Sequence, residues 1–406
     1  MKPIVPFLLL ALVAPALAQA TNPQADALVE SANEAKKAGK LDVAISTLKT
    51  AISMDPKNEP GLISLGRAYG AKGDYVSAEK TFVDLLTKVN PKSAEGHRYL
   101  SLTYLRKGDK TKALEWAQKA IVLAPKDWES HHLMAEVHLS MANIEKGIEA
   151  EKAVLAIDKN NTDALRGLVV AYRAQKKFDL AIAEALKLAK AEPSDLGVQL
   201  QVAALYGEKG DRKKAKAALD AVEKKASGRP AALENVAAAY AMMGAGEDAF
   251  RLYKKLVEKV PESPTVRLAL ANLFLMKGQF DPAKTHAEKA RDLVPKSGEP
   301  HRTLGLIFAA KEDLKGAEAA FRKAMALEPT RMETHLALGS VLAQANRIDE
   351  AIAEFEIVRK AAPAAKELLS PLCQLYRKKA DKTKGKDVCL AACKDAGVKP
   401  EDCAVP

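Results

Sequence analysis

Residues 298–329 read GEPHRTLGLIFAAKEDLKGAEAAFRKAMALEP. Apolar residues recur at intervals of three and four in both halves of this stretch, which is the period of a helix and not that of a strand. The polar residues 311–313 separate the two halves. Pro329 lacks a backbone donor and pushes the residue before it out of the helical conformation. The stretch therefore predicts two helices that meet near residue 312 and end before Pro329.

The same proline position returns with a period of 34 residues along much of the chain. Its occurrences are Pro91, Pro125, Pro193, Pro261, Pro295, Pro329 and Pro363, and Lys159 and Ser227 interrupt the series. A fixed period of this length is typical of a solenoid, in which each unit buries its apolar face only by stacking on its neighbours. The chain is therefore predicted to be all-α and built from tandem helix pairs.

Two further positions of the repeat are nearly always small. One holds Ala44, Ala78, Ala113, Gly147, Ala181, Ala215, Ala249, Ala283, Ala317 and Ala351, with one additional residue between Ala78 and Ala113. The other lies twelve residues earlier and includes Gly66, Ser101, Gly305 and Gly339. Small side chains at fixed positions are needed where two helices approach closely. Large residues three positions after the second small position, such as Phe308, are expected to pack into it.

This pattern resembles the tetratricopeptide repeat (TPR). The residues that carry the resemblance in one unit are Leu304, Gly305, Phe308, Ala317, Phe321 and Pro329, and in another Leu65, Gly66, Tyr69, Ala78 and Phe82. The resemblance covers ten tandem repeats over residues 25–363. It implies a right-handed TPR superhelical solenoid of antiparallel helix pairs. It also implies a concave groove, lined by the first helix of each pair, that binds a protein or peptide segment.

The first twenty residues differ from the repeats. Lys2 is followed by an apolar run around residues 8–10 and then by the small-residue sequence Ala16-Leu17-Ala18. This order is typical of a secretory signal peptide with an A-x-A cleavage site. Residues 1–20 are therefore expected to be removed, leaving residues 21–24 as a short mature N-terminus and no membrane span. A membrane anchor is the alternative, but the apolar run is short for a bilayer and no lipidation cysteine follows it. A periplasmic or secreted location is expected.

All four cysteines lie in residues 364–406, which are expected to form a helical cap. They are Cys373, Cys389, Cys393 and Cys403. In an oxidising compartment an even, clustered set predicts disulfides, and a short cap cannot bury enough apolar area to be stable unaided. Turns expected near Thr383 and Gly397 favour pairing of Cys373 with Cys393 and of Cys389 with Cys403. A zinc site is the alternative, although no C-x2-C spacing is present.

The charge balance favours some partners over others. The chain has 63 basic and 52 acidic residues and a net charge of +11, which favours acidic partners or anionic polymers of the cell envelope. The densest basic run lies in the cap and is expected to be either a solvated end or a docking site for such a polymer. It comprises Arg377, Lys378, Lys379, Lys382, Lys384 and Lys386. Nucleic acid is not expected, because the basic residues are scattered among acids without an aromatic stacking platform.

The resemblance implies which residues line the groove, namely the first-helix positions that lie off the packing stripe. The N-terminal half contributes Arg67, Arg98, Arg106, Arg166 and Arg173, accompanied by Glu95, Glu129, Glu136 and Asp163. The C-terminal half contributes Leu200, Leu268, Leu275, Met276, Leu306 and Leu336. These side chains either receive a ligand with apolar and polar parts, or the leucines pack on the neighbouring helix while the arginines pair with those acids.

Two other features of the repeats need an interpretation. One repeat position holds His97, His131, His301 and His335, which are expected to cover the entrance of the first helix. They are not expected to bind a metal, because equivalent positions of adjacent repeats are too far apart for one ion to bridge. The fourth repeat carries Glu151 in place of the apolar filler and Lys159 in place of proline. Departures of this kind gather at functional or weak sites, so local opening is expected there. The alternative is that the second helix of this repeat rotates slightly and Ala150 or Val154 fills the gap.

No catalytic motif occurs, and no cofactor is expected. The family's carboxylate clamp is not expected either, because Asn33 is present but Val29, Ser64, Glu95 and Tyr99 stand at its other positions. The expected function is therefore a non-catalytic scaffold or adaptor in a bacterial cell-envelope assembly. The alternatives are an accessory subunit that presents substrate to a glycan- or polysaccharide-processing enzyme, and a surface-attachment protein that holds anionic polymers.

Overall fold

The computed structural model describes residues 22–363, 368–381, 383–397, 399 and 403. All the regular elements in these residues are helices, so the predicted all-α fold is confirmed. None of these helices has the length and apolar character that crossing a bilayer requires. The predicted signal peptide, residues 1–20, lies outside the described residues.

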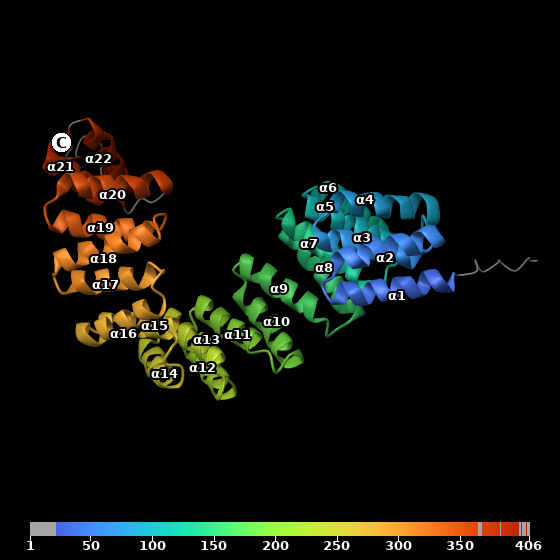
Figure 1. Cartoon of the computed structure of the whole chain (residues 1–406), viewed down its shortest axis with the longest axis horizontal. Coiled ribbons are helices and arrows are strands. Elements are labelled where there is room, and N and C mark those ends of the chain that lie inside the picture. The colour runs from blue at the N-terminus through green and yellow to red at the C-terminus, as the bar shows by residue number, and fades with distance from the viewer. Residues whose placement is uncertain (1–21, 364–367, 382, 398, 400–402, 404–406) are drawn as a thin grey trace, which may run out of the picture. The chain divides into compact units, whose positions relative to one another are not determined.

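The helices alternate between the first and second members of antiparallel pairs (Figure 1). The first members are α1 (Pro23–Lys37), α3 (Glu59–Lys72), α5 (Ala94–Lys107), α7 (Trp128–Ser140), α9 (Thr162–Ala174), α11 (Leu196–Lys209), α13 (Pro230–Met242), α15 (Pro264–Met276), α17 (Glu299–Ala310) and α19 (Met332–Gln344). The second members are α2 (Leu41–Met54), α4 (Tyr75–Asp84), α6 (Lys110–Leu123), α8 (Ile144–Ile157), α10 (Phe178–Ala191), α12 (Arg212–Lys225), α14 (Gly246–Lys259), α16 (Phe280–Leu293), α18 (Leu314–Leu327) and α20 (Ile348–Ala361). The cap consists of α21 (Leu369–Lys379) and α22 (Lys384–Asp395).

The chain divides into two compact units, residues 1–198 and residues 199–406, with the boundary inside α11. In the N-terminal unit, α1, α3, α5, α7 and α9 contact one another in sequence. In the C-terminal unit, α15 contacts α17 and α17 contacts α19. These first helices therefore lie side by side within their unit. In each unit we call the exposed surface of its odd-numbered helices up to α19 the first-helix face of that unit.

The helix boundaries follow from the residues that mark them in the sequence. The second helix α6 ends at Leu123, two residues before Pro125. Between paired helices, Gly73 has a φ of 83°, a left-handed conformation that glycine adopts without steric cost. The carboxylate of Asp74 then accepts the backbone N–H of Ser77 at 3.0 Å and caps the second helix. The predicted breaks between helices are confirmed at these positions.

The additional residue between Ala78 and Ala113 is absorbed by a π-helical turn at the end of the second repeat. This turn, Leu85–Val89, continues α4 and ends where the backbone N–H of Asn90 bonds to the carbonyl of Leu85 at 2.9 Å. A π-helical turn takes one more residue than an α-helical turn, so it lengthens the chain without displacing the helices that follow. The additional residue therefore lies before Pro91, and the proline series keeps its period of 34 residues from Pro91 onward.

The two small positions are used differently. Ala317 and the other alanines of the first position are fully buried. At the second position, a Cβ atom added to Gly305 would lie 2.6 Å from the ring of Phe321, and one added to Gly339 would lie 2.8 Å from the ring of Phe355. The large side chain that packs against the second small position therefore comes from the second helix of the pair. The prediction that Phe308 fills the position is wrong, because residues three apart on one helix share a face and do not point at each other.

Two disulfides close the cap. They join Cys373 to Cys389, with Cα atoms 4.7 Å apart, and Cys393 to Cys403, with Cα atoms 6.0 Å apart. All four cysteines are paired, but the predicted partners are wrong. The chain reverses around Asp381, so Cys373 and Cys389, at equal sequence distances from it, face each other. Cys393 lies one turn farther along α22 and therefore pairs with the segment that follows this helix.

Candidate partner-binding surface

Two of the five predicted groove arginines are held in ion pairs. The side chain of Arg98, on α5, is 12% exposed and contacts Asp127 at 3.6 Å and also Glu129. Arg166, on α9, contacts Asp195 at 3.4 Å. These contacts tie a first helix to the start of the following repeat. The alternative expectation, pairing with the accompanying acids, is confirmed for Arg98 through Glu129, whereas Arg166 pairs with Glu192 and Asp195, which were not expected as its partners.

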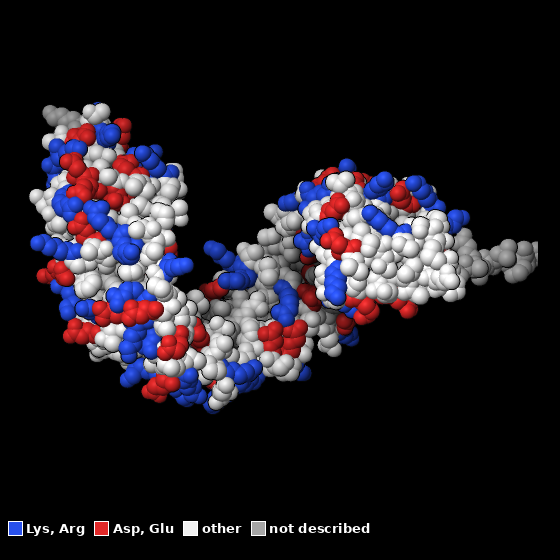
Figure 2. Space-filling model, viewed as in Figure 1, with Lys and Arg blue, Asp and Glu red and all other residues white. Residues whose placement is uncertain are grey.

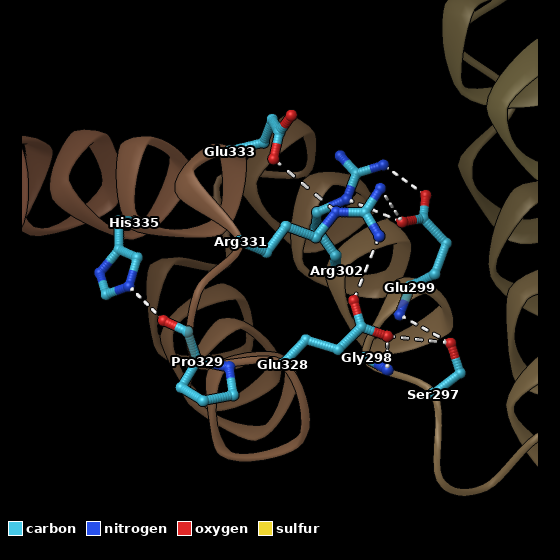
Figure 3. A network of polar contacts seen from close by, with 9 residues as sticks. All are labelled: Ser297, Gly298, Glu299, Arg302, Glu328, Pro329, Arg331, Glu333 and His335. Atoms are coloured by element: carbon cyan, nitrogen blue, oxygen red, sulfur yellow. Dashed lines mark hydrogen bonds and ion pairs between the residues drawn. The ribbon is translucent and has the colours of Figure 1, made fainter. Parts of the chain in front are cut away.

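A related network occupies the start of α17 and α19 (Figure 3). Arg302, at the repeat position of Arg98, contacts Glu299, and Glu299 also contacts Arg331 of the next repeat at 2.7 Å. The carboxylate of Glu328 accepts the backbone N–H of Gly298 at 2.6 Å. This hydrogen bond and the nearby Arg331 lower the pKa of Glu328. The charges of the network neutralise one another, so it stabilises the stacking of repeats.

Histidines cover the entrance of the first helix, as predicted for their shared repeat position. Nε2 of His131 lies 2.9 Å from the carbonyl oxygen of Pro125. Nε2 of His335 lies 3.0 Å from the carbonyl oxygen of Pro329 (Figure 3). Arg267 takes the same position in another repeat, where its Nε donates to the carbonyl of the corresponding proline at 2.7 Å. These side chains therefore have a structural role at the helix start.

Arg67 and Arg106 differ from the other arginines of the groove. Both are exposed, and neither has a carboxylate partner among the described residues, whereas Arg173 has an interaction partner. They line one pocket of 270 Å³ on α3, α4 and α5. The rest of its lining is Gly66, Gly70, Ala71, Tyr75, Phe82, Tyr99, Leu102 and Thr103. We call this the basic pocket.

The ring of Tyr99 contacts two guanidinium groups, and that of Arg67 lines the basic pocket. The guanidinium carbon of Arg67 lies 4.9 Å from the centre of the Tyr99 ring, and that of Arg98 lies 5.0 Å from it. The ring also stacks on Phe82, with centroids 5.9 Å apart. Burial raises the pKa of the Tyr99 hydroxyl, although the two arginines oppose this effect. Burial and the charge of Arg67 lower the pKa of Lys36 on α1.

The corresponding pocket two repeats later carries the opposite charge. It has a volume of 290 Å³ and is lined by His132, Glu136, Leu139, Glu151, Asp163, Arg166, Gly167 and Val170. We call it the acidic pocket. Glu136 stands at the repeat position of Arg67, and Gly167 stands at that of Tyr99. The charge of the basic pocket is therefore a property of its own residues and not of the repeat.

Glu151 closes the gap that the sequence leaves in the fourth repeat. It is 1% exposed, its carboxylate lies 3.0 Å from Nδ1 of His132, and it fills the space beside Gly167. The hydrogen bond to Glu151 raises the pKa of His132, while burial raises the pKa of Glu151 itself. A polar pair thus replaces the apolar filler. Local opening of this repeat stays a prediction.

The predicted apolar residues of the groove are of two kinds. The leucines Leu200, Leu268, Leu275, Leu306 and Leu336 are half-buried. Among them, Leu306 and Leu336 pack against the hydrophobic cluster of the C-terminal repeats. By contrast, Met276 is 83% exposed, and Met242 is 85% exposed. Sequence analysis missed Met242, although it stands at the same repeat position as Met276 and Arg106.

The basic run of the cap is interspersed with acids. Lys379 contacts Asp349 at 2.6 Å, and Arg377 also has an interaction partner. Lys384 lines a pocket of 670 Å³ between α20 and the cap that has acidic residues in its wall. Lys382 lies outside the described residues. Basic and acidic side chains also alternate over the visible surface of α13–α20 (Figure 2), so docking of an anionic polymer stays a prediction.

Comparisons with known proteins agree on the repeat. Family models described as tetratricopeptide repeat match residues 25–58, 63–127, 240–306 and 308–372. A search of curated proteins finds no match. Similar solved structures include a thermophilic TPR protein of Thermus thermophilus, at 20% identity over 45% of this chain and 98% of that one, with a TM-score of 0.40. Another is MamA, at 24% identity over 40% of this chain and 94% of that one, with a TM-score of 0.36. A third is a human IFIT1 dimer with PPP-AAAA, at 16% identity over 83% of this chain and 86% of that one, with a TM-score of 0.45.

Proposed function

Because this chain belongs to the tetratricopeptide repeat family, we propose that it is a non-catalytic scaffold that binds a segment of a partner protein along its first-helix face. Proteins with this repeat are generally interaction scaffolds. The proposal depends on the repeat position shared by Arg106, Met242 and Met276, whose side chains are all exposed. Met242 and Met276 belong to the C-terminal unit and Arg106 to the N-terminal unit, and large exposed side chains such as these are typical of an interaction surface.

We further propose that the protein acts in the bacterial cell envelope. Two disulfides in the cap favour an oxidising compartment, since cytosolic thiols are kept reduced. The segment typical of a signal peptide at residues 1–20 favours the same location. The net charge of +11 favours a partner with an acidic surface.

A capture experiment with matched variants tests this function. The purified chain, crosslinked to an envelope extract, is compared with Met242→Lys/Met276→Lys and with Val76→Lys/Val122→Lys. The two valines are 72% and 69% exposed on second helices, so the control adds the same charge to another surface. We expect the methionine variant to recover at least about tenfold less partner, because exposed anchors carry much of the energy of an interface.

Two results of this experiment would contradict the proposal. One is recovery of as much partner by the methionine variant as by the valine variant, which would show that Met242 and Met276 are not part of the binding surface. The other is turnover of a substrate by the purified chain alone. Recovery of a glycan- or polysaccharide-processing enzyme would instead support the accessory-subunit alternative.

A further inference from the structure

We propose that the basic pocket binds an acidic side chain, Asp or Glu, next to an apolar residue within an internal segment of the partner. The proposal rests on the proposed function and adds the chemistry that one part of the first-helix face recognises. It follows from a contrast between arginines within the N-terminal unit. Arg98 and Arg166 have their carboxylates in the chain itself, whereas Arg67 and Arg106 have none among the described residues.

The arrangement of Arg67 favours a carboxylate as ligand. The guanidinium carbon of Arg67 lies 4.9 Å from the centre of the Tyr99 ring, and Tyr99 is in turn stacked on Phe82. This cation–π contact restrains the guanidinium, and its N–H groups have no carboxylate partner among the described residues, so they can form two parallel hydrogen bonds to a carboxylate of the partner. Because the side chain is already ordered, binding loses less conformational entropy. Arg106, on the next first helix, supplies a second positive charge to the same pocket.

The remaining lining favours an apolar neighbour for that carboxylate. Tyr75, Leu102 and Ala71 provide aromatic and aliphatic surface, and glycines stand at two further positions of the wall. A volume of 270 Å³ suits one or two side chains and not a folded domain. Pockets of this kind combine apolar walls with a few polar groups that fix orientation. A single acidic residue with an apolar neighbour satisfies both parts of the pocket.

An internal acidic residue fits better than the carboxylate of a chain end. The carboxylate clamp of this family shares Tyr99 with the basic pocket, but its positions at Val29, Ser64 and Glu95 lie outside the pocket lining and carry no cation. The amide oxygen of Asn33 already accepts from Lys36 at 3.0 Å and from Ser64 at 3.1 Å. First helices also continue on both sides of the pocket, so a bound segment can pass through it.

The acidic pocket provides an internal comparison. It lies on the same face of the N-terminal unit, but Glu136 replaces Arg67 and Gly167 replaces Tyr99. A carboxylate brought there would meet Glu136 and Asp163, and the guanidinium of Arg166 is already paired with Asp195. The selectivity for acidic residues is therefore expected from the basic pocket alone, and reversal of the charge there should reverse the preference.

Selection from displayed peptide libraries tests this inference. One library holds random ten-residue segments between fixed linkers, and a second presents the same segments with a free C-terminus. The purified chain is compared with Arg67→Gln/Arg106→Gln and with Lys80→Gln/Lys152→Gln, which removes two exposed charges from second helices. We expect the original chain and the lysine variant to enrich Asp or Glu beside an apolar residue in the first library. The arginine variant should lose this enrichment and bind a selected peptide at least about tenfold more weakly.

Each other outcome has a defined meaning. Peptides selected without acidic enrichment, or equally well by the arginine variant, would overturn the inference and leave the proposed function standing. Enrichment in the free-terminus library alone would overturn it in favour of a chain-end ligand. Failure of the original chain to select any peptide would contradict the proposed function as well. Unchanged helical circular dichroism of both variants shows that lost binding is not lost folding.

Discussion

Replacing Phe321 with alanine is expected to lower the free energy of unfolding by about 3–5 kcal/mol. The ring is fully buried and packs onto Gly305 of the paired helix. Its removal leaves a cavity that the glycine cannot fill, since glycine has no side chain to move into it. Urea unfolding followed by circular dichroism, with hydrogen exchange of α17 and α18 to localise the loss, measures the effect.

The same contact predicts the effect of a larger residue at position 305. Gly305→Ala should destabilise the protein by about 1–3 kcal/mol, because the added Cβ would lie 2.6 Å from Phe321. The double variant Gly305→Ala/Phe321→Leu should lose less free energy of unfolding than the sum of the two single variants, because leucine leaves room for the added methyl group. Gly207→Ala is the control: no atom lies within 4 Å of the added Cβ, so it should be neutral or stabilising. Additive costs in the double variant would contradict the packing described here.

Removing the disulfide between the two cap helices should have the second largest effect. Cys373→Ser/Cys389→Ser is expected to cost the cap about 2–5 kcal/mol, because the crosslink restricts the unfolded chain and holds α21 against α22. Leu372 and Tyr376 of α21 belong to the hydrophobic cluster of the last repeats, so opening of the cap exposes that cluster. Hydrogen exchange of α19–α22 measures the loss of protection.

The other disulfide provides the matched control for this prediction. Cys393→Ser/Cys403→Ser removes a crosslink that ties α22 to the segment after it and closes a shorter loop, so a smaller loss is expected. Protection of α19–α22 that is equal in both variants and in the original chain would contradict the role given to the cap. Peptide mapping without reduction checks the two pairings.

The repeat itself could be predicted from the sequence because its determinants are local. Pro125 and Pro329 stop helices through their own backbone chemistry, and Ala317 stays small because two helices meet there. Such constraints act on single positions and therefore recur with the period of the chain. They specify helix pairs and their boundaries without knowledge of any contact between distant residues.

The details that sequence reasoning missed depend on contacts between helices. The ring that covers Gly305 comes from Phe321 because of the way the paired helices are rotated, which periodicity does not reveal. The disulfide partners depend on a chain reversal around Asp381, two residues before the turn that was predicted. The separation of Arg98, which is paired, from Arg67, which is not, depends on where the acids of the next repeat lie. A pattern of spacing alone cannot distinguish these cases.

Hydrogen exchange on the complex tests the central claim most directly. The partner recovered from the envelope extract is added to the purified chain, and exchange is compared with that of the free chain, peptide by peptide. Binding along the first-helix face predicts slower exchange in first helices such as α3, α5, α13 and α15, with little change in the second helices α4, α6, α14 and α16. Slower exchange confined to the second helices or to the cap would contradict the account.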